Sequence, residues 1–443
     1  MAFKLKPLLL VTSIALALSG CGESVSSSNG EGHAQQQVNE NQNQGNGNND
    51  GNGNDNGSGS DGQTPAFNEA TLLASLVDNV ITPTFTEFDS KAKAQPAIVK
   101  AYCDLETNYD PTMGDEEAKA ALNAAKVAAQ NAWKETMVSW QHAELMIIGP
   151  LSANDKSLRN RIYSWPNAST CSVDQDVVFF AVGNINGNAY DISKRSDKRR
   201  GLDAMEYLLF NDDLAHSCSI NSAEVLGDWN TQTEQARKVS RCKFAVEVAN
   251  DLSDSATELL YEWSGEDGYA SQFKNAGQPG SPYPTTLKAI NEISDALFYM
   301  TEELKDYKLA TPLGLFANKC GSEIACPEEV ESIYAKHSIE NIRANIAAFE
   351  KIFLGGTSEN TGFDDFLDSN DATDTKELML KGITDAKAAA DAISTDLQTA
   401  LTNDTTAVEH NHAKVKDVTD QLKNDFINKL ALELPKTSAG DND

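Results

Sequence analysis

The segment GLDAMEYLLF, residues 201–210, places two carboxylates, Asp203 and Glu206, three residues apart among apolar side chains. Residues three apart on a helix share a face. Two carboxylates on one face offer hard oxygen ligands to a divalent cation or to ferric iron. Alternatively, one carboxyl group keeps a proton beside its neighbour and acts as a general acid. In a purely structural interpretation, Asp203 caps the helix start and Glu206 faces water.

Arg161 and Trp165 occur in the segment RIYSWP, about forty residues before this pair. An arginine can form a bidentate ion pair with a carboxylate, and a tryptophan can form the wall of a cleft. A surface arginine and a core tryptophan are the alternative. Because residues 201–210 are apolar on most sides, we expect that helix to be buried. Its two carboxylates then need a cation, a proton or Arg161.

The familiar signatures of catalysis are missing from the sequence. Its six histidines form no H-E-x-x-H pair, which excludes the standard zinc-peptidase helix. No G-x-S-x-G elbow, P-loop or dinucleotide fingerprint occurs either. We therefore assign no catalytic residue.

The elements that must position the carboxylates are helices. Apolar residues recur with a helical period in three stretches: Leu287, Ile290, Ile293, Leu297, Met300 and Leu304; Ile383, Ala386, Ala390, Ile393, Leu397 and Leu401; and Val415, Val418, Leu422 and Leu430. Two longer helices are predicted over 116–146 and over 222–263, the second with Ser222 as its N-cap. No convincing alternating strand pattern occurs. The sequence predicts an all-α fold of packed helical bundles.

Glycine and proline clusters divide the globular part of the chain. The plainest break is GQPGSPYP at residues 277–284. We predict a first helical bundle over residues 67–276 and a second over 277–443. The carboxylate pair, Arg161 and Trp165 are expected to line a cleft where the two bundles meet.

The first 66 residues resemble an export signal followed by a tether. Lys4 and Lys6 precede a short apolar run, and LSGC ends at Cys21, a pattern that resembles the lipobox of bacterial lipoproteins. We predict a signal peptide over 1–20, lipidation of Cys21, and a disordered low-complexity linker over 21–66. Gly22, rather than aspartate, favours the outer membrane facing the periplasm over the inner membrane or the cell surface.

Charge and cysteine content restrict the partners and the compartment. A formal net charge of −30 disfavours nucleic acid and anionic lipid headgroups. Six cysteines remain after Cys21, an even number that suggests disulfides in an exported chain. We predict a bond between Cys320 and Cys326. The other four cysteines, 103, 171, 218 and 242, allow three pairings.

Several segments, in order along the chain, resemble the imelysin-like family, which includes insulin-cleaving metallopeptidase-like and iron-regulated bacterial envelope proteins. These segments are RIYSWP, GLDAMEYLLF, ATPLGLF, PEEVESIYAKHSIENI and GFDDFL. The resemblance covers most of the chain after residue 66. It implies an all-α fold of two helical bundles with a site in the cleft between them.

The family signature is G-x-H-x-x-E, and this chain departs from it. Gly201 and Glu206 match, but Asp203 occupies the histidine position. An aspartate there can bind a hard cation but weakens the case for catalytic zinc. The resemblance places Gly201, Asp203 and Glu206 in a binding cleft. It also adds to this cleft Arg161 and Trp165, together with Glu331 and Ser332 of the family's "ES" pair.

The resemblance implies an envelope lipoprotein without catalytic activity that binds a metal or a metal-bearing ligand and assists iron uptake. Its metal, a divalent cation or ferric iron, is expected on Asp203 and Glu206. The alternatives are a metallopeptidase and a tethered scaffold or adhesion partner. Expected partners are outer-membrane lipid through Cys21 and components of iron uptake, with no nucleic acid.

Overall fold

Helices account for nearly all regular structure in residues 67–435, the part of the chain that the computed structural model describes. The α-helices are α1 (Glu69–Ser75), α2 (Thr82–Asn108), α3 (Glu116–Glu144), α4 (Ala153–Ile162), α5 (Thr170–Val182), α6 (Gly201–Phe210), α7 (Glu234–Ser264), α8 (Tyr269–Lys274), α9 (Thr286–Leu297), α10 (Thr311–Leu313), α11 (Ser338–Phe353), α12 (Phe363–Ser369), α13 (Thr373–Ala392), α14 (Leu397–Asn403), α15 (Thr405–Gln421) and α16 (Ile427–Lys429). The predicted all-α fold is confirmed.

Shorter elements connect these helices. The π-helices are η1 (Leu76–Ile81), η8 (Met300–Ala310) and η10 (Leu422–Phe426). The 3₁₀ turns are η2 (Gly149–Leu151), η3 (Ile192–Lys194), η4 (Asp197–Arg199), η5 (Ile220–Ser222), η6 (Glu224–Leu226), η7 (Trp229–Thr231) and η9 (Pro327–Glu329). Within residues 67–435, the regular strands are β1 (Asn184–Ile185) and β2 (Asn188–Ala189), which form one short antiparallel hairpin.

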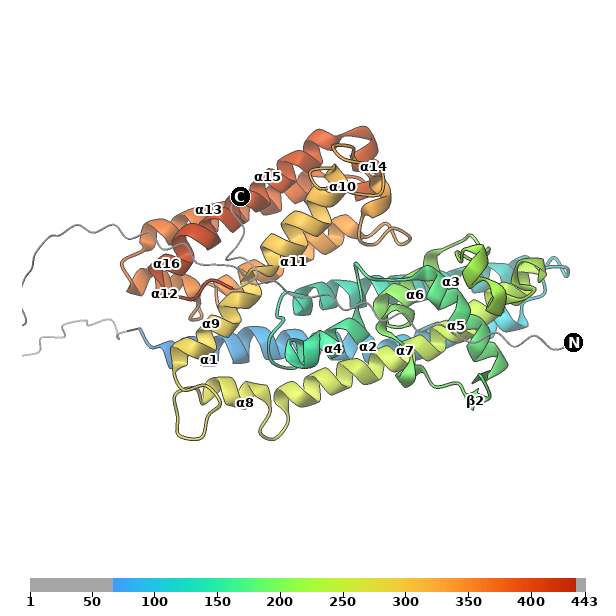
Figure 1. The fold of residues 1–443 in the computed structure, drawn as a ribbon, viewed down its shortest axis with the longest axis horizontal. Helices are drawn as coiled ribbons and strands as arrows, with labels where there is room; N and C mark the ends of the chain where they lie inside the picture. The colour runs from blue at the N-terminus through green and yellow to red at the C-terminus, as the bar shows by residue number, and fades with distance from the viewer. Residues whose placement is uncertain (1–66, 436–443) are drawn as a thin grey trace, which may run out of the picture. The chain divides into compact units, whose positions relative to one another are not determined.

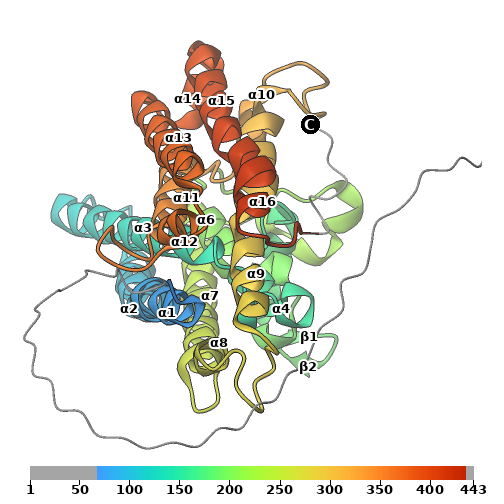
Figure 2. The same cartoon turned by 90° about the vertical axis from the view of Figure 1, so that its left-hand side faces the viewer.

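The helices pack through apolar faces into one continuous core. In Figure 1, α2 lies along α7 and α3, while α13 lies along α15; α11 contacts both α13 and α3. Figure 2 shows α13, α15 and α16 above α1, α2 and α8. Trp133, Trp140 and Trp263 are fully buried. The described residues, 67–435, belong to one compact unit, with GQPGSPYP joining α8 to α9. The bundle boundary at residue 277 stays a prediction.

Two helix predictions need correction. The long helix begins at Glu234 rather than near Ser222, with the Thr233 hydroxyl accepting from the Ala236 amide at 3.2 Å. The residues before it form 3₁₀ turns because the buried Trp229 indole donates to the Leu214 carbonyl, 2.9 Å away. Ser222 is therefore not the N-cap.

The second correction concerns the helix predicted across residues 383–401, which is broken. Ile393 is extended, and the Asp396 carboxylate caps α14 by accepting from the Thr399 amide at 3.0 Å. The Arg343 guanidinium satisfies the end of α13 by donating to the carbonyls of Ala390 and Ile393. All six apolar residues of this stretch are nevertheless buried.

Three disulfides fasten the described residues. The predicted Cys320–Cys326 bond is confirmed, and the remaining cysteines pair as Cys103–Cys242 and Cys171–Cys218. No helix within residues 67–435 is long and apolar enough to cross a membrane. The predicted signal peptide, Cys21 and the linker lie outside the described residues.

Candidate functional site

A glycine seats α6 against the end of α4. Gly201 has a φ of 77°, in the left-handed region that favours glycine. A Cβ on this residue would lie 2.5 Å from the Ile162 carbonyl oxygen and 2.6 Å from that of Arg161. Glycine alone permits this approach, which brings the first turn of α6 beside Ser164. Gly201 thus positions the helix that carries both carboxylates.

Asp203 is held by Ser164, which lies two residues after the end of α4. Its Oδ2 accepts from the Ser164 amide at 2.6 Å and from the Ser164 hydroxyl at 2.9 Å. Burial raises the pKa of Asp203 to about 7, although these hydrogen bonds and the charge of Arg159 favour the ionised form. Asp203 is therefore not a helix cap facing water, and it holds a proton through part of the neutral range.

Glu206 is anchored by the chain that leads into α11. Its Oε1 accepts from the backbone amides of Tyr334 and Ala335, each at 2.9 Å, and the residue is 5% exposed. Burial, with the charges of Asp203 and Glu331, raises the pKa of Glu206 to about 8 despite the two amide donors. Glu206 thus joins the two carboxylate-bearing segments, 201–210 and 331–335.

The pair opens into a cavity of about 1140 Å³. Its carboxylates outnumber its cations by seven to one: Asp203, Glu206, Glu302, Asp306, Glu328, Glu329 and Glu331 line it, with Lys319 as the one cationic lining residue. Its aromatic residues are Trp165, Tyr207, Tyr307, Phe316 and Tyr334. The lining residues come from both sides of residue 277, and the charge of the cavity favours a cationic ligand.

Beneath the cavity, Glu331 belongs to a buried ion pair. Its Oε1 lies 2.9 Å from Lys308 Nζ and accepts from Tyr163 and Gln141 at the same distance. Its Oε2 accepts from Asn341 at 2.9 Å. Because a cation and three further donors satisfy Glu331, this carboxylate supports the floor and is not free to bind a ligand ion.

A second buried pair fixes the segment that carries Trp165. Arg159 donates to Glu144, whose other oxygen accepts from Tyr299 at 2.9 Å. Arg159 also donates to the Trp165 carbonyl at 3.2 Å. Arg159 therefore positions the segment that carries Trp165, which lines the cavity.

The predicted cleft residues are not all brought together. Trp165, Asp203, Glu206 and Glu331 line the cavity. Arg161 instead pairs with Glu258 of α7, because α4 turns its side chain away from α6. Ser332 is fully buried and accepts from Asn341 at 3.0 Å, so it supports the loop from behind.

Sequence reasoning missed the contribution of η8. Glu302, Asp306 and Tyr307 line the cavity, and Lys308 reaches the buried network. Asp306 and Tyr307 lie four and five residues after Glu302, and the five-residue spacing of Tyr307 suits the π-helix. The apolar residues over 287–304 were read as one α-helical stripe, so the change to a π-helix at Met300 was not predicted. The spacing itself was the available signal.

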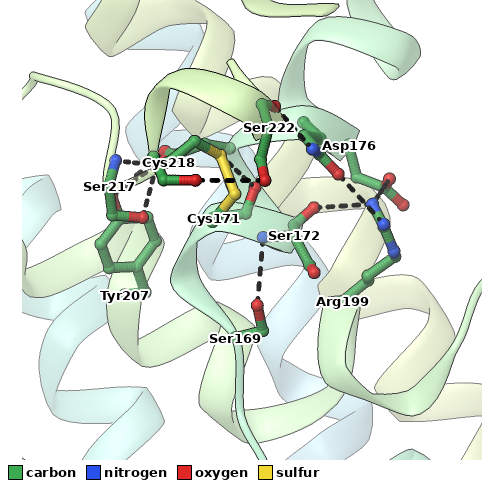
Figure 3. Close-up of a disulfide and its surroundings, with 12 residues drawn as sticks. Ser169, Cys171, Ser172, Asp176, Arg199, Tyr207, Ser217, Cys218 and Ser222 are labelled. Carbon is green, nitrogen blue, oxygen red and sulfur yellow. Dashed lines mark hydrogen bonds and ion pairs between the residues drawn. A yellow bond between two sulfur atoms is a disulfide. The ribbon is translucent and has the colours of Figure 1, made fainter.

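One cavity wall is covalently braced. Cys171, at the start of α5, lines the cavity and bonds to Cys218 in the segment after α6 (Figure 3). Next to it, the Ser217 amide and the Tyr207 hydroxyl both donate to Asp174, at 2.8 and 2.9 Å. The disulfide and these hydrogen bonds keep the Tyr207 side of the cavity in place.

The donor set does not fit a resident catalytic metal. Among residues 67–435, no group of three or more His, Cys, Asp and Glu side chains is arranged to hold a metal ion. Catalytic zinc sites use three protein ligands. Asp203 Oδ1 and Glu206 Oε2 accept no hydrogen bond from any residue that the structure describes. These two oxygens suit a cation that brings its other ligands with it.

Comparisons with known proteins agree with this architecture. Residues 81–424 match the sequence model of the Imelysin family. The chain resembles a protein described as an iron-regulated protein A precursor from Parabacteroides distasonis ATCC 8503, with a TM-score of 0.62 and 18% identity over 84% of this chain and 97% of that one. It also resembles an imelysin-like protein from Psychrobacter arcticum 273-4, with a TM-score of 0.56 and 15% identity over 83% and 96%. At these identities the likeness concerns the fold. No curated protein matches the chain.

Proposed function

This chain belongs to the imelysin family, and from that premise we propose that it is an envelope-anchored binding protein for a metal-bearing cation in iron uptake. Lipid on Cys21 anchors it to the outer membrane on the periplasmic side, where components of iron uptake are its partners. One structurally similar protein is described as iron-regulated. That description concerns the other protein, and it supports the proposal of a role in iron uptake.

The acidic cavity is the observation that carries the proposal. Seven carboxylates and one lysine line a space of about 1140 Å³. A bare ion leaves most of such a space empty, whereas small-molecule sites commonly occupy roughly 300–1,000 Å³. The size therefore favours a cation that carries its own ligands, water or an organic chelator, over an ion held by protein groups alone.

Asp203 and Glu206 receive the positive charge in this proposal. Each has one oxygen anchored by protein donors and one that accepts no hydrogen bond from the described residues, and both residues line the cavity. The anchored oxygen fixes the side chain, so little conformational entropy is lost when the free oxygen meets a ligand. The cation takes over from the proton that burial otherwise keeps on these groups.

Titration calorimetry of the full chain in detergent tests the proposal. The probes are hexaamminecobalt(III), whose ammine shell does not exchange, and Fe²⁺ in the absence of oxygen. We expect binding that weakens at least about tenfold in the variant Asp203→Asn/Glu206→Gln. The control Asp104→Asn/Glu116→Gln removes the same charge from exposed helix positions and keeps the affinity. Absence of binding by both probes overturns the proposal.

A further inference from the structure

Building on the proposed function, we infer that the cavity selects cations with an apolar organic shell, through an aromatic wall formed by Trp165, Tyr307 and Phe316. All three line the same cavity as Asp203 and Glu206. Tyr307 is 49% exposed and Phe316 is 45% exposed, so both rings present apolar surface that a ligand can cover. Such surface is stabilised when an apolar ligand covers it.

The geometry of two of these rings suits a cation. The centroids of Trp165 and Tyr307 lie 6.4 Å apart, with an angle of 87° between the rings. The pair is T-shaped, and the face of an aromatic ring is the negative part of its quadrupole, which attracts cations. Lys308 Nζ already lies 5.8 Å from the Trp165 centroid, so this indole has a cation beside it within the protein.

Carboxylates supply the complementary charge at the same wall. Glu302 lies one π-helical turn before Tyr307 and lines the cavity with it. Asp306, the neighbour of Tyr307, pairs with Lys305 at 3.1 Å. Glu206 adds a buried carboxylate that also lines the cavity. Aromatic faces beside carboxylates recognise alkylated or aryl-bearing cations better than hydrated ions, which pay more to lose their water.

The loop that carries Phe316 is held in place. The Cys320–Cys326 disulfide closes the loop that follows it, and the Asn318 side-chain amide donates to the carbonyls of Thr311 and Ile324 at 3.0 and 2.9 Å. Contacts within the protein therefore hold the segment that carries Phe316 beside the cavity. A preorganised apolar surface costs little to use in binding.

Two cobalt(III) complexes of equal charge test the inference on the full chain. Hexaamminecobalt(III) has a polar shell, and tris(2,2′-bipyridine)cobalt(III) has an aromatic one; neither exchanges its ligands. We expect the bipyridine complex to bind at least about tenfold more tightly. Tyr307→Leu and Phe316→Leu should each reduce that preference and leave the ammine complex nearly unaffected. Tyr261→Leu, at an exposed site on α7 outside the cavity lining, is the matched control.

The outcomes separate the two proposals. Equal affinity for the two complexes, or a preference that survives both aromatic variants, overturns the aromatic selection while the cation site stands. Failure of both cobalt complexes to bind overturns this inference, and failure of Fe²⁺ to bind as well overturns the proposed function. A preference lost equally in Tyr261→Leu also contradicts the assigned wall.

Discussion

Lys308 Nζ lies 2.9 Å from Glu331 Oε1, in an ion pair whose two side chains are each 1% exposed. The pair joins η8 to the segment before α11, and Lys308 also donates to Asn345 of α11 at 2.9 Å. Two segments that line the cavity are thus fixed to each other from below. The shape of the acidic cavity depends on this buried pair.

Removing one member of the pair should destabilise the fold. Lys308→Met leaves the Glu331 carboxylate buried without its cation, and we expect a loss of about 3–5 kcal/mol in the free energy of unfolding, measured by urea denaturation. Lys100→Met breaks an ion pair with Asp104 that is about 60% exposed, and should cost less than about 1 kcal/mol. Similar losses in the two variants would contradict the assigned role of Lys308.

The carboxylate pair should make stability fall as the pH rises. Burial raises the pKa of Asp203 from 3.8 to about 7 and that of Glu206 from 4.5 to about 8, so the native state binds more protons than the unfolded state between these limits. Stability from these groups is present in full below about pH 4, declines as the pH rises, and is gone once the pH has passed 7 to 8. Thermal melts of Asp203→Asn/Glu206→Gln should depend less on pH between 5 and 8 than wild type; equal slopes would rule out the raised pKa values.

Arg159 and Arg161 should differ sharply when each is replaced by leucine. Arg159 pairs with Glu144, and their side chains are 9% and 0% exposed, whereas the pair of Arg161 and Glu258 is 25% and 40% exposed. We expect a loss of about 3–5 kcal/mol for Arg159→Leu and below about 1 kcal/mol for Arg161→Leu, measured by chemical denaturation. The Arg161→Leu variant should also keep the affinity for hexaamminecobalt(III). A large drop in that affinity would show that Arg161 belongs to the binding site.

Cys21 should carry the lipid anchor. The apolar run before LSGC predicts processing at this cysteine. Cys21→Ser should therefore abolish metabolic labelling with palmitate and move the protein out of the detergent phase. Cys320→Ser, which removes a disulfide cysteine instead, should keep the label. Labelling that persists in Cys21→Ser would exclude the anchor.

The helices could be predicted from the sequence because apolar residues recur with the helical period on the face that is buried. Val415, Val418, Leu422 and Leu430 are all buried as the period requires. The breaks were harder to predict, because tertiary contacts decide them: the Trp229 indole fixes the turns before α7, and Arg343 satisfies the carbonyls at the end of α13. Local propensity contains neither contact.

The site was predictable only where residues lie close in sequence. Asp203 and Glu206 share a helix face, so their pairing followed from spacing. The partner of Glu206 is the backbone at Tyr334 and Ala335, more than a hundred residues away, and a backbone amide leaves no trace in residue types. The sequence pointed to Arg161, whereas Arg159 is the arginine that contacts the segment of Trp165. Residues two apart on a helix point in different directions, and the sequence does not show which of them faces the cavity.

Proton release on cation binding tests the central claim most directly. If a metal-bearing cation displaces protons from Asp203 and Glu206, calorimetry of hexaamminecobalt(III) binding in buffers of different ionisation enthalpy should show release of about one proton per cation at pH 7, falling toward zero near about pH 9.5. Asp203→Asn/Glu206→Gln should release none. Binding at pH 7 with no proton release in the wild-type chain would contradict the claim that this carboxylate pair receives the ligand.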